Sequence, residues 1–251
     1  MNLLRCFKCI ISFFTILPVR TYCKVEDIFK HQYITPLVVP LITGLIPAGL
    51  AYTLIVYVKL PKLLVIVLTY TSLLLLTGFN HIDGFADTVD ALMFRGSVEE
   101  RLKILKDPHI GTAGVVSIII ILLTSITALT YLNTYLLVKT LYISEVLSKT
   151  TYCLCARWGK YPSYTGLGYH VVYYARNTKF FTLRALALSI PQTWIVLGIY
   201  GLLVYTITSI SSIAIFLKIQ KYFNGAVGDV FGFILEFSRT LCIVLILICL
   251  G

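Results

Sequence analysis

The chain has 251 residues, of which 58% are hydrophobic and 13% are charged. This composition excludes an ordinary soluble domain, and apolar runs of the length of a membrane-spanning helix recur along the chain. The formal net charge of +10 is typical of a membrane protein whose cytoplasmic loops contact anionic lipids, so we expect lipid headgroups and no nucleic acid as partners.

The first segment, residues 1–20, places Arg5 and Lys8 before a short apolar run. It lacks the small-residue cleavage site of a signal peptide, and the run is too short to cross a membrane. We therefore predict a helix that lies in the membrane interface and is kept in the mature protein.

Longer apolar segments follow. Clear spans are predicted at residues 36–58, 63–77, 115–132, 135–152 and 226–250. Residues 185–217 are too many for one straight span, and Pro191 and Gly201 could break them, so we predict two short spans there. A lipid-facing backbone must satisfy its own hydrogen bonds. The expected fold is therefore all-α: one domain over residues 1–251, a polytopic integral membrane helix bundle of about six to seven transmembrane helices plus the N-terminal interfacial helix.

Basic residues near the ends of the spans predict the orientation. The N-terminal arm carries five of them, namely Arg5, Lys8, Arg20, Lys24 and Lys30. The polar loops 78–114 and 156–184 carry more, whereas only Lys59 and Lys62 lie in a turn on the other side. We expect a multi-pass protein of the cell membrane whose active site faces the cytoplasm.

The chain has seven cysteines, and most lie in or beside apolar runs. Cys6 and Cys9 have the spacing of a metal-binding pair, but no second Cys or His pair accompanies them. We therefore expect buried, reduced cysteines that pack as small hydrophobic residues.

The segment from Gly78 to Ala91 follows an uncharged apolar run and contains Asp83, Asp87 and Asp90. On a helix this spacing places the three carboxylates on one face, where like charges repel by roughly 0.2–0.5 kcal/mol per pair. The nearest basic residue, Arg95, cannot balance them. A solvated acidic helix end is the alternative, but the chain has only 11 acidic residues. We predict a divalent cation site with oxygen ligands, which suit Mg²⁺, Ca²⁺ or Mn²⁺.

The next polar segment, residues 102–114, opens the following span. Its glycines and threonine at a helix start can offer backbone N–H groups to a phosphate, although an ordinary capped helix start fits equally well. The residues predicted here to bind substrate are Lys103, Lys106, Gly111, Thr112 and Gly114. Asp107 is predicted as a further metal ligand, with capping of the turn as the alternative.

Single residues complete the predicted site. His81, two positions before Asp83, could act as a general base or bind substrate, and a structural role fits equally well. His81, Asp83 and Asp87 form the predicted catalytic set. Asp229 has no basic residue three or four positions away, so we expect it to join the metal site; complementing the helix dipole is the alternative.

Two residues near Asp229 are predicted to bind substrate, namely Gly228 and Glu236. Glu236 could instead pair with Arg239. In the same way Glu145, near the middle of a predicted span, is most simply paired with Lys149 at i+4.

Residues 78–91 and 102–114 closely resemble the signature of the cobalamin (5′-phosphate) synthase family, also called adenosylcobinamide-GDP ribazoletransferase. Its pattern His-x-Asp-Gly-x-Ala-Asp-Thr-x-Asp-Ala and its Lys/Arg-Asp-x-x-Ile-Gly-x-x-Gly block are both intact here. The stretches 14–18, 166–168 and 225–232 match more loosely.

The resemblance implies a Mg²⁺-dependent transferase. It would move the adenosylcobinamide-phosphate group from adenosylcobinamide-GDP to α-ribazole or its 5′-phosphate, release GMP, and form adenosylcobalamin or its 5′-phosphate. The residues leave open which acceptor is preferred and whether the protein is a homo-oligomer.

Two other readings remain. A CDP-alcohol phosphotransferase uses similar chemistry, but its pattern needs an Arg after an Ala and a downstream Gly and Asp pair that this chain lacks. A cation transporter would have acids at mid-depth in broken helices or an internal repeat, and most acids here lie at span ends.

Overall fold

The computed structural model describes residues 3–19 and 22–251, and all regular elements in these ranges are helices. The predicted all-α class is therefore confirmed. In chain order the elements are α1 (Leu3–Phe14), α2 (Val25–Phe29), the 3₁₀ turn η1 (Gln32–Ile34), α3 (Thr35–Val38), α4 (Pro40–Thr43), α5 (Leu45–Val56), α6 (Lys62–Leu76), α7 (Asn80–Met93), α8 (Val98–Ile104), α9 (Thr112–Tyr131), α10 (Thr134–Trp158), α11 (Leu167–Asn177), α12 (Phe181–Tyr222) and α13 (Gly228–Leu250).

Several helices have the length and apolarity of membrane spans, which makes the fold a membrane helix bundle. Within the described residues four stretches qualify, namely Gln32–Val56, Thr112–Tyr131, Phe181–Tyr222 and Gly228–Leu250. A fifth is added if α6 and α7, which are bent by 87° at a short break, form one broken span. The predicted number of six to seven spans remains a prediction.

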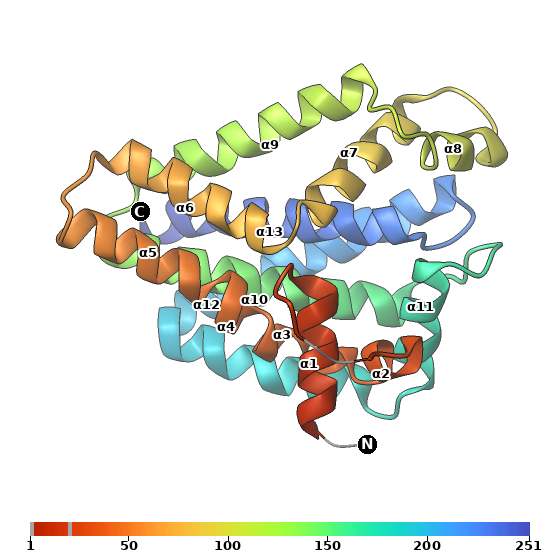
Figure 1. Ribbon diagram of the computed structural model, residues 1–251, viewed down its shortest axis with the longest axis horizontal. Coiled ribbons are helices and arrows are strands. Elements are labelled where there is room, and N and C mark those ends of the chain that lie inside the picture. The colour runs from red at the N-terminus through yellow and green to blue at the C-terminus, as the bar shows by residue number, and fades with distance from the viewer. Residues whose placement is uncertain (1–2, 20–21) are drawn as a thin grey trace.

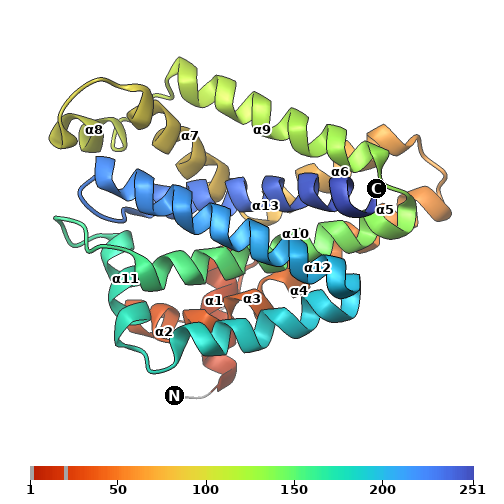
Figure 2. The same ribbon diagram turned by 180° about the vertical axis from the view of Figure 1, so that it is seen from behind.

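The long helix α12 consists of two legs that meet at Gly198. This residue has φ 61° and ψ −146°, a conformation that glycine adopts far more readily than other residues. The hydroxyls of Ser189 and Tyr205 lie 2.8 Å apart, whereas a straight helix would separate these residues by about 24 Å. The chain therefore doubles back here (Figure 2). Two helical legs were predicted, but the break lies at Gly198 and not at Pro191 or Gly201.

The long helices run in one common direction, and their connections gather at two ends (Figure 1). The polar segments around α8 and before α11 lie at one end, together with the start of α13. The turn between α5 and α6 lies at the other end, as the distribution of basic residues predicts. Helix α1 runs across the long helices, which is the direction expected of an interfacial helix.

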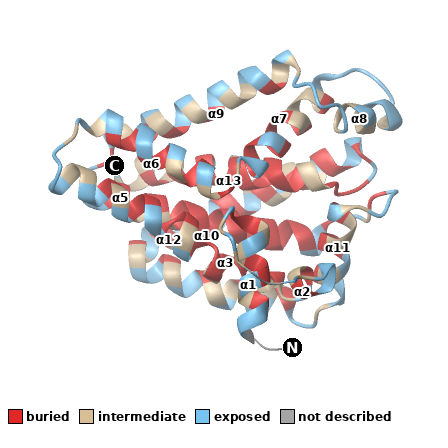
Figure 3. Ribbon diagram, in the orientation of Figure 1, coloured by how far each residue is buried: buried red, intermediate tan, exposed pale blue. Residues whose placement is uncertain are grey.

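Helix α10 forms the centre of the bundle and is buried over most of its length (Figure 3). It contacts α3, α4, α5, α11, α12 and α13. Because it carries both Glu145 and Lys149 with no exposed surface, charged side chains lie in the middle of an apolar core.

Four charged side chains pair with one another in this core, although Glu236 Oε1 and Arg239 Nη2 have no hydrogen-bond partner among the described residues. Lys149 Nζ lies 2.8 Å from Glu145 Oε2, and Arg239 Nε lies 2.6 Å from Glu145 Oε1. Arg239 also donates to Glu236, and Thr43 donates its hydroxyl proton to Glu145. The predicted pairs Glu145–Lys149 and Glu236–Arg239 are confirmed, and Arg239 joins them into one network with balanced charge.

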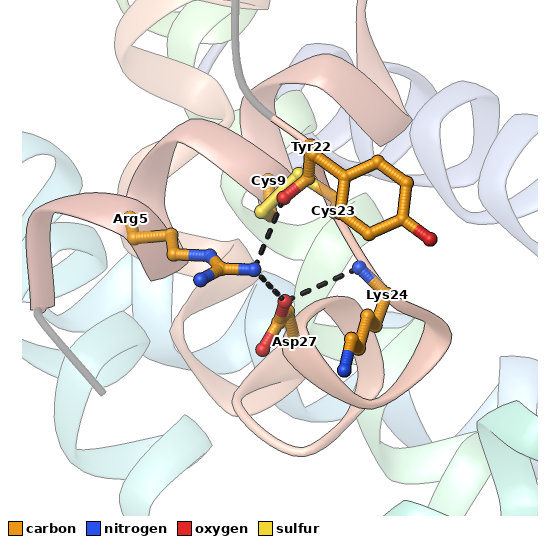
Figure 4. Close-up of a disulfide and its surroundings, with 6 residues drawn as sticks. All are labelled: Arg5, Cys9, Tyr22, Cys23, Lys24 and Asp27. Carbon is orange, nitrogen blue, oxygen red and sulfur yellow. Dashed lines mark hydrogen bonds and ion pairs between the residues drawn. A yellow bond between two sulfur atoms is a disulfide. The ribbon is translucent and has the colours of Figure 1, made fainter.

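A disulfide joins Cys9 of α1 to Cys23, just before α2 (Figure 4). Beside it, the Arg5 guanidinium donates to Asp27 over 2.8 Å and to the carbonyl of Tyr22 over 3.2 Å. The prediction of reduced cysteines was wrong for this pair, because sequence spacing does not reveal that the chain folds back here. Cys6, Cys153, Cys155 and Cys242 are free and buried as predicted. Arg20, counted above in the N-terminal arm, lies outside the described residues.

Candidate active site

A sharp turn between α6 and α7 sets the direction of the acidic segment. Gly78 and Phe79 both have left-handed backbone conformations, with φ of 64° and 59°. A Cβ on Gly78 would lie 2.7 Å from Ile16 Cγ2, so a side chain there is disfavoured by space as well as by conformation. The turn directs α7 across the bundle. His81 and Asp83 lie in the first turn of this helix, where His81 is buried and Asp83 is exposed.

Helices α7 and α13 cross at two glycines. A Cβ on Gly84 would lie 3.1 Å from both the Cα and the carbonyl oxygen of Asp229. A Cβ on Gly232 would lie 3.0 Å from the carbonyl oxygen of His81. The two backbones therefore touch, and this close approach brings Asp229 next to the acidic face of α7.

A cavity of about 300 Å³ opens at this crossing. His81, Asp83, Gly228 and Asp229, four residues predicted for the site, line one part of its wall. The remaining lining residues are mostly apolar or aromatic: Phe13, Phe14, Asn80, Tyr152, Leu167, Val171, Phe231, Gly232 and Leu235. The volume is at the lower limit for a small-molecule site, and a few polar groups in an apolar wall are typical of such sites.

His81 is buried beside this cavity. Its Nδ1 has no hydrogen-bond partner among the described residues. One edge of its ring packs against Phe14, with the ring centroids 6.1 Å apart. Since a buried polar atom without a partner costs about 1–3 kcal/mol, this nitrogen is well suited to bind a ligand or a water molecule.

Three acidic residues lie near the crossing of α7 and α13, namely Asp83, Asp87 and Asp229. Asp87 experiences the negative charges of Asp83, Asp229 and Asp90, and Asp229 that of Asp83. No ion pair involves Asp83, Asp87 or Asp229 in the part of the chain that the structure describes. Within the described part of the chain, no three or more His, Cys, Asp or Glu side chains lie close enough together to form a metal-binding group.

Asp90, the third acid of the motif, has a structural contact of its own. Its carboxylate accepts hydrogen bonds from the backbone N–H groups of Gly111, over 2.7 Å, and Gly114, over 2.8 Å. A Cβ on either glycine would lie within 2.5 Å of an Asp90 oxygen. Asp90 therefore caps the start of α9 and occupies the N–H groups that the sequence suggested for a phosphate. Thr112, the first residue of α9, is exposed beside them.

The other predicted residues lie apart from the cavity. Asp107 is exposed and accepts from the backbone N–H of His109 over 2.9 Å, and this hydrogen bond lowers the pKa of its carboxyl group. Lys103 is exposed, and the ammonium of Lys106 lies 5.0 Å from the centre of the Tyr164 ring. Glu236 is fully buried in the ion network below the cavity.

Several cavity residues were not predicted. Phe13 and Phe14 come from α1, and Tyr152 comes from the C-terminal third of α10. Phe14 contacts Tyr152 with ring centroids 5.3 Å apart. Only the loose family match at residues 14–18 marked this region, because no sequence pattern shows that an interfacial helix closes a cavity formed by helices far away in the chain.

Comparisons with known proteins agree on one family. A family model described as Cobalamin-5-phosphate synthase matches residues 6–247. A Pyrobaculum calidifontis protein named adenosylcobinamide-GDP ribazoletransferase is 34% identical over 245 residues, covering 96% of this chain and 98% of that protein. A Methanosarcina barkeri protein of the same name is 30% identical over 98% of this chain and 93% of its own length. One from Saccharolobus solfataricus is 43% identical over 49% of this chain and 47% of its own length. No solved structure matches significantly.

Proposed function

This chain belongs to the cobalamin-5-phosphate synthase family, and we propose that it transfers the adenosylcobinamide-phosphate group of adenosylcobinamide-GDP to α-ribazole or to α-ribazole 5′-phosphate. GMP is released, and the product is adenosylcobalamin or its 5′-phosphate. The observation that carries this proposal is the convergence of His81, Asp83 and Asp229 on one cavity at the crossing of α7 and α13.

The reaction is a displacement at phosphorus. A ribose hydroxyl of the acceptor forms a new P–O bond to the phosphorus on the cobinamide side of the diphosphate. The P–O bond to the bridging oxygen breaks, and GMP leaves with that electron pair. The hydroxyl proton passes to a base, for which the unpartnered Nδ1 of His81 is the nearest candidate in the cavity wall.

Asp83, Asp87 and Asp229 would hold Mg²⁺, with Mn²⁺ as the alternative. Their fit rests on donor chemistry: three carboxylates that form no ion pair within the described residues offer the oxygen ligands that Mg²⁺ prefers. When bound, the ion would neutralise charge on the diphosphate and the departing phosphate. Asp90 and Asp107 are less suitable ligands, because each already accepts hydrogen bonds elsewhere.

The end of the bundle that holds the cavity would face the cytoplasm. The supporting observation is the concentration of Lys and Arg in the N-terminal arm and in the segments around α8 and α11, compared with Lys59 and Lys62 at the other end. Anionic lipids would contact these basic segments.

The test is a turnover assay with the purified protein. Adenosylcobinamide-GDP, Mg²⁺ and either acceptor should yield GMP and a complete corrinoid in equal amounts, detected by chromatography and mass spectrometry. Asp83→Asn should lose most of this activity while still eluting as a folded protein. If wild-type protein forms no complete corrinoid with either acceptor, the proposal is wrong.

A further inference from the structure

The loop between α10 and α11, residues 159–166, is fixed against the start of α13. Ala226 donates its backbone N–H to the carbonyl of Lys160 over 2.9 Å. At the other side of the loop, a Cβ on Gly168 would lie only 2.0 Å from the carbonyl oxygen of Ala226, so α11 begins in direct contact with the same segment. Both ends of the loop are therefore fixed against the segment that leads into α13.

Tyr164 lies in the middle of this loop. Leu167, three residues further along the chain, lines the cavity. Burial and the negative charge of Asp229 raise the pKa of the Tyr164 hydroxyl group. The side chain keeps 36% of its surface exposed. A Cβ on Gly166 would lie 2.8 Å from ring atom Cε2, so the ring packs against a backbone that must lack a side chain. An aromatic ring is thus held in place while part of it faces solvent.

The ammonium of Lys106 covers this ring from the opposite loop, 5.0 Å from the ring centre. Lys106 is exposed and forms no ion pair in the described part of the chain. A lysine over an exposed ring is held only weakly. A phosphate oxygen binds an ammonium more strongly through a charge-assisted hydrogen bond, so an anionic ligand can draw Lys106 away from the ring.

We propose that Tyr164 is the platform on which the guanine base of the donor stacks, while Lys106 moves from the ring to the diphosphate. The base then takes the place of the ammonium over the ring, and the phosphates extend toward Asp229 and the cavity. This assignment rests on the proposed function, because it concerns the nucleotide part of the same donor. Tyr164 touches the donor but not the reacting bond, so it acts as a binding and specificity residue.

The test measures binding of GDP and of inorganic diphosphate to the purified protein by equilibrium dialysis, independently of turnover. Tyr164→Leu should weaken GDP binding by about tenfold, the typical effect of losing one base–aromatic stack, and leave diphosphate binding unchanged. Tyr164→Phe should keep GDP affinity within about twofold, since the ring remains. Lys106→Met should weaken both ligands, because it removes the charge that contacts phosphate.

Tyr135→Leu is the matched control, because Lys139 lies 4.0 Å from the Tyr135 ring centre at the other end of the bundle. It should bind GDP like the wild type. Equal GDP affinity in Tyr164→Leu and wild type, or an equal loss of GDP and diphosphate binding in Tyr164→Leu, would overturn the assignment even if the turnover assay succeeds. If turnover fails while GDP binding still depends on Tyr164, the proposed reaction is wrong and the base site stands. A wild-type protein that binds no GDP would refute the base site, whatever the turnover assay shows.

Discussion

The buried ion network gives the most specific stability prediction. Arg239 contacts Glu145 over 2.6 Å and also donates to Glu236, and none of these side chains is exposed. In Arg239→Met the two carboxylates would share Lys149 as their only positive partner. Removing one partner of a buried ion pair typically costs about 3–5 kcal/mol, because a charge is left without compensation. We expect a loss of unfolding free energy in that range.

The control keeps the charges balanced. In the double variant Glu145→Gln with Lys149→Met, the pair Glu236–Arg239 remains, and the amide oxygen of Gln can still accept from Arg239. Replacing a whole buried pair by uncharged residues of similar size is often nearly neutral. We therefore expect the double variant to lose less than about 2 kcal/mol of unfolding free energy. This loss is smaller than that expected for Arg239→Met, even though the double variant changes two residues and Arg239→Met changes one.

Unfolding of the detergent-purified proteins, followed by helical circular dichroism during titration with sodium dodecyl sulfate, would measure both differences. The two variants should separate clearly, with Arg239→Met the less stable. Equal losses in both variants would show that packing volume, and not charge balance, determines stability at this point. An Arg239→Met protein as stable as the wild type would refute the network's role altogether.

The other predictions concern the site and its orientation. Asp229→Asn should fold normally, lose most turnover and need more Mg²⁺, measured as activity against Mg²⁺ concentration; unchanged turnover and Mg²⁺ dependence would leave Asp229 only its helix-dipole role. Wild-type activity should disappear in excess chelator and return with added Mg²⁺. Full turnover in chelator would show that the reaction needs no metal ion. Asp90→Ala should lose about 1–3 kcal/mol of unfolding free energy, since the N–H groups of Gly111 and Gly114 lose their acceptor, and Asp90→Asn should lose less; a fully stable Asp90→Ala protein would contradict the capping role. In a background without other cysteines, Pro61→Cys should react in intact cells with a membrane-impermeant maleimide and Glu99→Cys should not, and equal labelling would refute the orientation.

The sequence predicted the helical class and the positions of most long helices, because long apolar runs have few other solutions. It also predicted that α12 breaks, but not at which residue. Gly198 and Gly201 are both glycines within one turn, and only packing distinguishes them. A Cβ on Gly201 would lie 2.9 Å from the carbonyl oxygen of Thr193, so Gly201 serves close packing while Gly198 adopts the positive φ.

The acidic motif was predicted only in part. Helical spacing correctly placed Asp83, Asp87 and Asp90 on one helix, and spacing alone gave all three the same role. The structure separates Asp90 from the other two, because the start of α9 folds back onto it. Spacing within one helix cannot reveal a contact with the N-terminus of another. The same limit applies to the crossing at Gly84 and Gly232, which depends on two segments far apart in the chain.

The distribution of charge connects the bundle core to the proposed chemistry. In the core, two acids and two bases balance one another, so the network adds no net charge below the cavity. Asp83 and Asp229 in the cavity wall, and Asp87 one turn further along α7, form no ion pair within the described residues, although the chain as a whole carries +10. A diphosphate would be attracted by the basic segments around α8 and α11, and would then meet carboxylates of its own sign. In the proposed function, a cation held between the diphosphate and these carboxylates would reduce the repulsion. We therefore expect the dependence on Mg²⁺ and the role of Asp229 to be lost or kept together.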